Sequence, residues 1–143
     1  MRLEELFEAL HHARAKYLLI GGLASILHGV PRTTVDIDIA VATSPKNLQR
    51  VITTLKNLGL TADTEHVDDI LAQGGITFRN DREVDVLTSL PGDADFGKFW
   101  SRRDKVAYHG VTIDVISKGD QIQLLRRVGR PKDLEDVELL EQP

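Results

Sequence analysis

Two aspartates, Asp36 and Asp38, lie one residue apart in an otherwise apolar run and are the residues best suited to chemistry. In a β-strand alternate side chains point to opposite faces, so Val35, Ile37 and Ile39 are expected to face the core while both carboxylates face the other surface. Like charges about 7 Å apart on one face are tolerated when a cation neutralises them, and paired carboxylates often hold Mg²⁺. The pattern therefore indicates a metal site. The alternative is an edge strand with a solvated acidic face.

A glycine pair precedes this acidic strand. Residues 15–20 are typical of a short buried strand, Gly21 and Gly22 of a turn, and residues 23–28 of the start of a helix. Glycines at such a turn let another group approach the backbone, and the free N–H groups at the start of a helix favour an anion. The order strand, glycine turn, helix and acidic strand predicts a phosphate-binding turn, although a plain tight turn has the same signature.

A third carboxylate, Asp85, lies in a second alternating segment, residues 83–87. If this segment pairs beside the first acidic strand, Asp85 faces Asp36 and Asp38. Three carboxylates can then hold two divalent ions about 3.5 to 4 Å apart, a spacing that suits phosphoryl or nucleotidyl transfer. Asp114 is a rival for the third position, but no glycine or basic residue accompanies it.

A bound triphosphate needs basic residues, because metal ions neutralise only part of its charge. Arg32 lies between the glycine turn and the acidic strand, where its guanidinium group can contact phosphate oxygens in a bidentate way. The alternative is an ion pair between Arg32 and either Asp36 or Asp38 in a metal-free fold.

Lys132 is a second basic candidate. It follows Pro131, which suits the first turn of a final helix, and from there it can reach toward the same site. Spacing alone instead favours a solvated helical face formed by Lys132, Asp133 and Asp136. The buried stripe of this helix is expected at Leu134, Val137 and Leu140.

The remaining periodicities alternate between helix and strand. Helices are predicted around Leu3, Leu6, Phe7 and Leu10, around Leu48, Val51, Ile52 and Leu55, and over residues 96–102, 121–128 and 131–140. Strands are predicted over residues 16–20, 35–41, 75–79, 83–88, 105–108 and 111–116. This order indicates an α+β fold, with a mixed β-sheet and helices packed mainly on one face. With 143 residues and 41% hydrophobic content, the chain suits a single domain over residues 1–143.

The composition of the chain argues against several kinds of partner and site. A net charge of −4 argues against broad electrostatic binding of nucleic acid, although Arg126, Arg127 and Arg130 could form a local basic patch. The absence of cysteine excludes disulfides and Cys-based zinc sites. The start of the chain lacks a signal-peptide pattern, and the longest apolar stretch, residues 17–27, is shorter than a membrane span. We therefore expect a cytoplasmic protein with no membrane partner.

Three motifs together resemble the DNA polymerase β-like nucleotidyltransferase superfamily. They are YLLIGG at residues 17–22, HGVPRTT at residues 28–34 and DID at residues 36–38. GRPKDLEDV at residues 129–137 resembles the ending of its small bacterial and archaeal branch, which includes AbiEii-type and minimal nucleotidyltransferases of toxin–antitoxin systems. The resemblance implies a polymerase β palm-like fold. It also implies a Mg²⁺-dependent enzyme that transfers a nucleoside monophosphate from a nucleoside triphosphate to an acceptor hydroxyl and releases pyrophosphate.

The resemblance also assigns roles to residues. Asp36, Asp38 and Asp85 match the catalytic metal ligands, and Asp85 is expected to help activate the acceptor hydroxyl. Two Mg²⁺ ions, or Mn²⁺ in their place, are the implied cofactors. The expected nucleotide-binding residues are Gly21, Gly22, Ser25, Arg32 and Lys132. The implied partners are a nucleoside triphosphate, an RNA, protein or small-molecule acceptor, and a cognate toxin or antitoxin.

Two positions depart from the family pattern. Many relatives carry a serine directly after the first glycine, where this chain has Gly22, with Ser25 only one helical turn later. Many members of the branch carry a lysine where this chain has Leu125. Both departures favour an alternative function, in which the domain binds a protein as an antitoxin or adaptor. The retained acids and glycines favour the enzyme, and a metal-dependent hydrolase would use the same acids.

Overall fold

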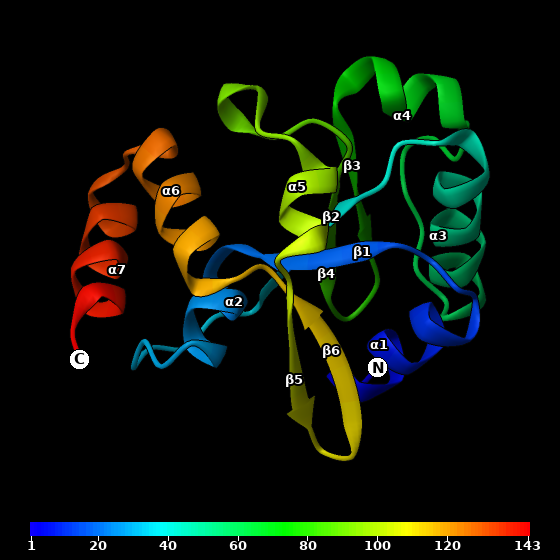
Figure 1. Cartoon of the computed structure of the whole chain (residues 1–143). Coiled ribbons are helices and arrows are strands. Elements are labelled where there is room, and N and C mark those ends of the chain that lie inside the picture. The colour runs from blue at the N-terminus through cyan, green and yellow to red at the C-terminus, as the bar shows by residue number, and fades with distance from the viewer.

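One six-stranded mixed sheet organises the chain, as Figure 1 shows. The computed structural model describes residues 1–143, apart from the side chain of residue 93. The strands are β1 (Tyr17–Ile20), β2 (Asp36–Val41), β3 (Gly75–Arg79), β4 (Glu83–Leu87), β5 (Asp104–Tyr108) and β6 (Val111–Val115). Their order in the sheet is β3-β4-β2-β1-β6-β5. The pairs β2–β4 and β1–β6 are parallel and the other three are antiparallel, which confirms the predicted α+β fold with a mixed sheet.

The helices lie around this sheet in two groups. They are α1 (Leu3–His12), α2 (Gly21–Leu27), α3 (Pro45–Asn57), α4 (Val67–Gln73), α5 (Phe96–Ser101), α6 (Lys118–Val128), α7 (Pro131–Glu141) and the 3₁₀ turn η1 (Pro91–Asp93). In Figure 1, α1, α3 and α4 lie toward one end of the molecule, and α6 and α7 toward the other. The sequence does not predict α4 or η1, because such short elements hold little periodicity. In the described part of the chain, no helix has the length and apolar character needed to cross a bilayer.

Apolar side chains form two separate clusters. The larger cluster contains the predicted stripes of α1 and α3 together with buried residues of the sheet, including Ile37 and Ile39. The smaller cluster joins α6 and α7 through Val30, Leu125, Val137 and Leu140. The C-terminal helices thus pack on each other through side chains that are distinct from the main core.

A buried asparagine at the start of α3 fixes the ends of two central strands. The Asn47 side chain accepts a hydrogen bond from the Lys16 N–H at 2.7 Å and donates to the carbonyls of Lys16 at 3.1 Å and Ala42 at 2.8 Å. Lys16 immediately precedes β1 and Ala42 immediately follows β2. Ser44 caps the helix by accepting a hydrogen bond from the Asn47 N–H at 3.2 Å. One side chain therefore holds the strand that precedes the glycine turn beside the strand that carries the acids.

Two predicted core positions are wrong. Val35 is 79% exposed, because β2 begins only at Asp36 and the preceding residues 30–35 run outside the sheet. Leu134 is 47% exposed, because α7 turns a different face inward. The buried residues of α7 follow the spacing i, i+3, i+4, i+7 and are Asp133, Asp136, Val137 and Leu140. The prediction that Asp133 and Asp136 belong to a solvated face is therefore also wrong.

The contrast between Val35 and its neighbour Ile37 predicts different costs of truncation. Ile37→Ala should lower the free energy of unfolding by about 2–5 kcal/mol, because it opens a cavity in the core. Val35→Ala should change that free energy by less than about 0.5 kcal/mol. Urea unfolding of both variants measures the difference, and equal costs would contradict the strand boundary.

Candidate active site

The three predicted acids lie on one face of two neighbouring strands. The parallel register of β2 and β4 sets Asp38 opposite Asp85, and Asp36 opposite Glu83. Because side chains alternate along each strand, Asp36, Asp38 and Asp85 share a face while Ile37 lies on the other. The rival Asp114 is on β6, on the far side of β1, where it is buried and pairs with Arg103 at 3.1 Å.

Electrostatic repulsion within this group is strong. Burial raises the pKa of Asp38 to about 7, together with a hydrogen bond to the Asp85 carboxyl group and the charges of Asp85 and Asp36. The charge of Lys132 acts in the opposite direction. The Thr77 hydroxyl donates to one oxygen of Asp85 and so orients that carboxylate. The pair formed by Asp38 and Asp85 is thus most stable when a proton or another cation lies between the carboxylates.

The chemistry of these side chains fits a hard divalent cation. All the donors are carboxylate oxygens, which is the ligand type that Mg²⁺ prefers. Among the described side chains, however, no group of three His, Cys, Asp or Glu residues already has an arrangement that could hold an ion. Asp38 and Asp85 face each other, whereas Asp36 lies two residues along and is exposed. Mg²⁺ or Mn²⁺ binding by all three therefore stays a prediction.

The glycine turn presses directly against Asp38. Gly21 begins α2 with a φ of +71°, a conformation that other residues rarely adopt, and a Cβ atom there would overlap Asp38 Oδ2. A Cβ atom at Gly22 would instead make an ordinary contact with Thr34 Oγ1 at 3.5 Å. The first glycine is thus required by the site itself, because only a hydrogen atom fits between the turn and the carboxylate.

A buried glutamine that the sequence analysis did not identify supports this turn. Gln121 of α6 is fully buried, and its Nε2 donates to the Gly21 carbonyl at 2.9 Å and to the Ser25 hydroxyl at 3.0 Å. Ser25 is also fully buried and lies beneath the turn. The available signal was a polar residue in line with the apolar positions Leu124, Leu125 and Val128 of α6.

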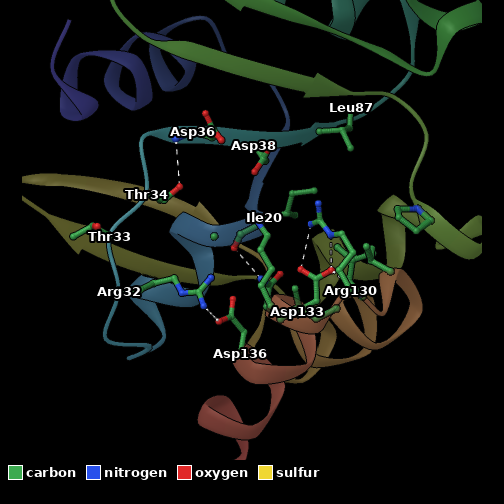
Figure 2. A pocket seen from close by; sticks show the side chains of 18 residues that line it. Ile20, Arg32, Thr33, Thr34, Asp36, Asp38, Leu87, Arg130, Asp133 and Asp136 are labelled. Atoms are coloured by element: carbon green, nitrogen blue, oxygen red, sulfur yellow. Dashed lines mark hydrogen bonds and ion pairs between the residues drawn. The ribbon is translucent and has the colours of Figure 1, made fainter.

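A cleft of about 260 Å³ opens between the acidic strand, the glycine turn and the two C-terminal helices. Figure 2 shows Asp36 and Asp38 on one side of it and the charged residues of α7 on the other. Its polar lining residues are Gly21, Gly22, Arg32, Thr33, Thr34, Asp36, Asp38, Gln121, Arg130, Lys132, Asp133 and Asp136. Its apolar lining residues are Ile20, Leu87, Pro91, Leu124, Leu125 and Val128.

Buried acids of α7 hold two arginines at this cleft. Arg32 pairs with Asp136 at 3.0 Å, and not with the β2 acids as the alternative from the sequence proposed. Arg130 makes two side-chain hydrogen bonds to Asp133, at 2.7 and 3.2 Å. Both aspartates are at most 3% exposed, and Arg32 offsets only part of the cost of burying Asp136, since burial still raises the pKa of that carboxyl group. This pairing explains why α7 turns acids inward where an apolar stripe was expected. Figure 2 shows both pairs.

The structure brings most of the predicted site residues together. Gly21, Gly22, Arg32 and Lys132 line the cleft with Asp36 and Asp38. Asp85 lines an adjoining cavity that shares Asp38 as a wall. Ser25 is fully buried and does not line the cleft, and its hydroxyl accepts a hydrogen bond from Gln121 beneath the turn.

Solved structures share this architecture. The lincomycin-bound lincosamide antibiotic adenylyltransferase LnuA superimposes with a TM-score of 0.69 at 20% sequence identity, covering 99% of this chain and 98% of that one. The chain has a nucleotidyltransferase fold. ANT(2'')-Ia in complex with adenylyl-2''-tobramycin gives a TM-score of 0.65 at 16% identity, with 95% and 83% of the chains covered. A nucleotidyltransferase-like protein from Paracoccidioides brasiliensis gives 0.58 at 18% identity, with 96% and 72% covered. No protein-family model and no curated protein sequence matches the chain.

The contact between Gly21 and Asp38 predicts that the two glycines respond differently to substitution. Gly21→Ala should lower the free energy of unfolding by about 2 kcal/mol or more, because the methyl group meets Asp38 and the backbone has positive φ. Gly22→Ala is the matched control and should leave that free energy nearly unchanged or slightly higher, since its space is open and alanine favours a helix. Chemical unfolding checks both, and a harmless Gly21→Ala would contradict the close approach.

The raised pKa of Asp38 predicts how stability depends on pH in the absence of metal. The folded state holds the proton up to about pH 7 whereas the unfolded chain releases it near pH 3.8, so stability falls as pH rises between these values. Asp38→Asn removes this penalty. The free energy of unfolding of this variant, relative to that of the wild type, should rise by about 1–3 kcal/mol between pH 5 and pH 8. This value is reduced to allow for the partial exposure of Asp38. Urea unfolding in a chelator tests this, and an advantage that is constant with pH would contradict it.

Proposed function

We propose that this protein is a nucleotidyltransferase that moves a nucleoside monophosphate from a nucleoside triphosphate to an acceptor hydroxyl. The observation that carries the proposal is the register of β2 and β4, which sets Asp38 opposite Asp85 beside the Gly21 turn and a cleft with basic residues. The fold supports it, since LnuA is an adenylyltransferase and ANT(2'')-Ia holds an adenylylated tobramycin. Nucleotidyl transfer needs a carboxylate group, a phosphate-binding turn and compensating positive charge, and this site offers all three.

The cleft residues would bind and orient the triphosphate. The absence of side chains at Gly21 and Gly22 lets phosphate oxygens approach the backbone at the start of α2. Lys132 is exposed at the cleft and Arg32 is 29% exposed in its side chain, so both can contact a phosphate from the solvent side. Gln121 keeps the Gly21 carbonyl bonded to α6, which holds the turn in place beside the cleft. The apolar lining formed by Leu124 and its neighbours offers a surface to the nucleoside.

Asp36, Asp38 and Asp85 would hold Mg²⁺, or Mn²⁺ in its place. When bound, the ion neutralises charge on the phosphates and makes the acceptor hydroxyl more acidic. The repulsion between Asp38 and Asp85 would then be relieved by the ion in place of the shared proton. Binding of the nucleotide with its metal ion would therefore depend on whether Asp38 and Asp85 are protonated.

In the transfer step, the acceptor oxygen forms a bond to the α-phosphorus. The bond between that phosphorus and the oxygen bridging to the β-phosphorus breaks, and pyrophosphate leaves with the bonding electron pair. Asp85 accepts the hydroxyl proton, while its hydrogen bond from Thr77 holds the carboxylate in place.

A binding role is the second candidate. Leu125 is 7% exposed and lines the cleft at the position where we expect a lysine by family resemblance. Its apolar side chain cannot contact a phosphate, which favours weak nucleotide affinity and an antitoxin or adaptor that binds a protein partner. Calorimetric titration with ATP, CTP, GTP and UTP in the presence of Mg²⁺ separates the two candidates, because the adaptor would bind none of them at millimolar concentration.

Removing both carboxylates of β2 tests the enzymatic proposal directly. The double variant Asp36→Ala with Asp38→Ala should lower Mg²⁺-dependent label transfer from a nucleoside triphosphate by about 100-fold or more. Its circular dichroism should match that of the wild type and its unfolding should stay cooperative, since neither side chain belongs to the apolar core. Glu138→Gln, on the exposed side of α7, is the control. Label transfer at the wild-type rate by the double variant would refute the proposed function.

A further inference from the structure

A threonine hydroxyl lies against the carboxylate to which the proposed function assigns the role of base. Thr77 of β3 stands opposite Asp85 in the antiparallel register of β3 and β4, and its hydroxyl donates a hydrogen bond to Asp85 Oδ1. Asp85 in turn stands opposite Asp38 of β2. Because paired residues of neighbouring strands present their side chains on the same face, these three side chains form one row across the sheet. The row ends in a hydroxyl group.

A hydroxyl group bonded to a carboxylate base is positioned to act as a nucleophile. In the proposed transfer the acceptor hydroxyl gives its proton to Asp85, so an acceptor must lie within hydrogen-bond reach of that base. The Thr77 hydroxyl makes this bond. Thr34, which lines the nucleotide cleft, has a different partner, because its hydroxyl accepts a hydrogen bond from the Asp36 N–H at 3.3 Å. Thr77 therefore has the contact that an acceptor needs.

The Thr77 hydroxyl is also close to where a nucleotide would bind. Thr77 is half-buried and lines an open depression of about 410 Å³ together with Asp85. Asp38 and Leu87 line both this depression and the nucleotide cleft. Since β4 lies between β2 and β3, a phosphate group beside Asp38 and the hydroxyl of Thr77 would meet over Asp85.

Backbone geometry leaves the space beside Thr77 open. Gly75 precedes Thr77 by two residues and so lies on the same face of β3, and both residues line the depression. Gly75 has a φ of +150°, and a Cβ atom there would overlap the Val86 carbonyl oxygen. A glycine is thus needed at this position. A phosphate group can approach the Thr77 hydroxyl over it without meeting a side chain.

Placement within the same chain favours this hydroxyl over water. A group that is already held in a reactive geometry behaves as if it were present at a very high concentration, because its orientation needs no further ordering. The pairing of β3 with β4 holds the Thr77 side chain next to Asp85. A nucleotide bound without an external acceptor would therefore encounter the Thr77 hydroxyl beside the base.

We propose that Thr77 is an internal acceptor, to which the protein transfers a nucleoside monophosphate from a nucleoside triphosphate when no other acceptor is bound. This inference rests on the proposed function and adds a modification site to it. Thr77 Oγ1 forms a bond to the α-phosphorus, and the bond between that phosphorus and the oxygen bridging to the β-phosphorus breaks. Pyrophosphate leaves with the bonding electron pair, and the hydroxyl proton passes to Asp85.

The modification would stop further transfer. A phosphodiester on Thr77 fills the depression beside Asp85, so a second acceptor hydroxyl cannot approach this carboxylate. It also removes the hydroxyl proton that Thr77 donates to Asp85. Self-modification would thus switch off a molecule that holds a nucleotide but has no acceptor.

Mass spectrometry of the intact chain tests the modification directly. The purified full chain is incubated with Mg²⁺ and each of ATP, CTP, GTP and UTP, without any added acceptor. We expect a mass increase of one nucleoside monophosphate with at least one of them, and peptide mapping should place it on Thr77. A radiolabel on the α-phosphate should become attached to the chain, whereas one on the γ-phosphate should not. Attachment to another residue, attachment of the γ-phosphate or no attachment would each overturn the proposal.

Three variants separate an acceptor from a residue that only orients Asp85. Thr77→Val keeps the shape of the side chain and should lower self-labelling by about 100-fold or more. Thr77→Ser keeps a hydroxyl group and should still be labelled at position 77. Thr112→Val, on the exposed surface of β6, is the matched control and should be labelled like the wild type. Unchanged labelling of Thr77→Val would overturn the proposal.

The hydrogen bond itself can be checked without nucleotide or metal. In the ¹³C-labelled chain, the NMR signal of the Asp85 carboxyl carbon should move in Thr77→Val and stay in place in Thr112→Val, because only the first variant removes a donor to that carboxylate. An unmoved Asp85 signal in Thr77→Val would overturn the contact on which the inference rests.

The internal acceptor and the proposed function fail in different ways. Titration with ATP and Mg²⁺ should shift the amide signals of Gly21 and Gly22 in the cleft, whether or not Thr77 is modified. Absence of these shifts would refute nucleotide binding and with it both proposals. Their presence in a chain that never gains mass would refute only the internal acceptor.

Discussion

The parallel pairing of β2 with β4 is the constraint on which the rest of the structure depends. It sets the carboxylates of Asp38 and Asp85 against each other, an arrangement that is unfavourable without a proton or cation. The pairing persists because the opposite face of the same strands is apolar and buried, with Ile37 and Val84 at the interior. Burial of the apolar face thus offsets the repulsion between the carboxylates on the opposite face. Proteins retain such repulsion mainly at functional sites.

Alternation along the strands made the acids and their common face predictable from the sequence. The period of two in residues 36–41 and 83–87 requires that Asp36 and Asp38 share a face and that Asp85 lies opposite to its apolar neighbours. Which strand pairs with which does not follow from alternation, so the meeting of Asp38 with Asp85 depended on the family resemblance until the sheet order was known. Alternation also did not predict where β2 begins, since Val35 is apolar but lies outside the strand.

The C-terminal helices show why the rest of the site could not be predicted. Helical periodicity assigns apolar residues to the inside, so it selected Leu134 and missed Asp133 and Asp136. Those acids are buried because Arg32 and Arg130 approach them, and Arg32 comes from a distant part of the chain. Gln121 was missed for the same reason, since its partner is the carbonyl of Gly21, 100 residues away. A local pattern can show that such a polar residue lies in line with apolar ones, but it does not show which distant group satisfies it.

The division of the apolar side chains into two clusters has a mechanical consequence. The main cluster includes the strands that Asn47 holds together, whereas Leu125, Val137 and Leu140 form the smaller cluster with Val30. Residues of both clusters line the cleft, and the ion pair of Arg32 with Asp136 and the bond of Gln121 with Gly21 lie along it. Leu124 of α6 packs in the main cluster and the adjacent Leu125 in the smaller one, so this helix ties the two clusters together and its position sets the width of the cleft.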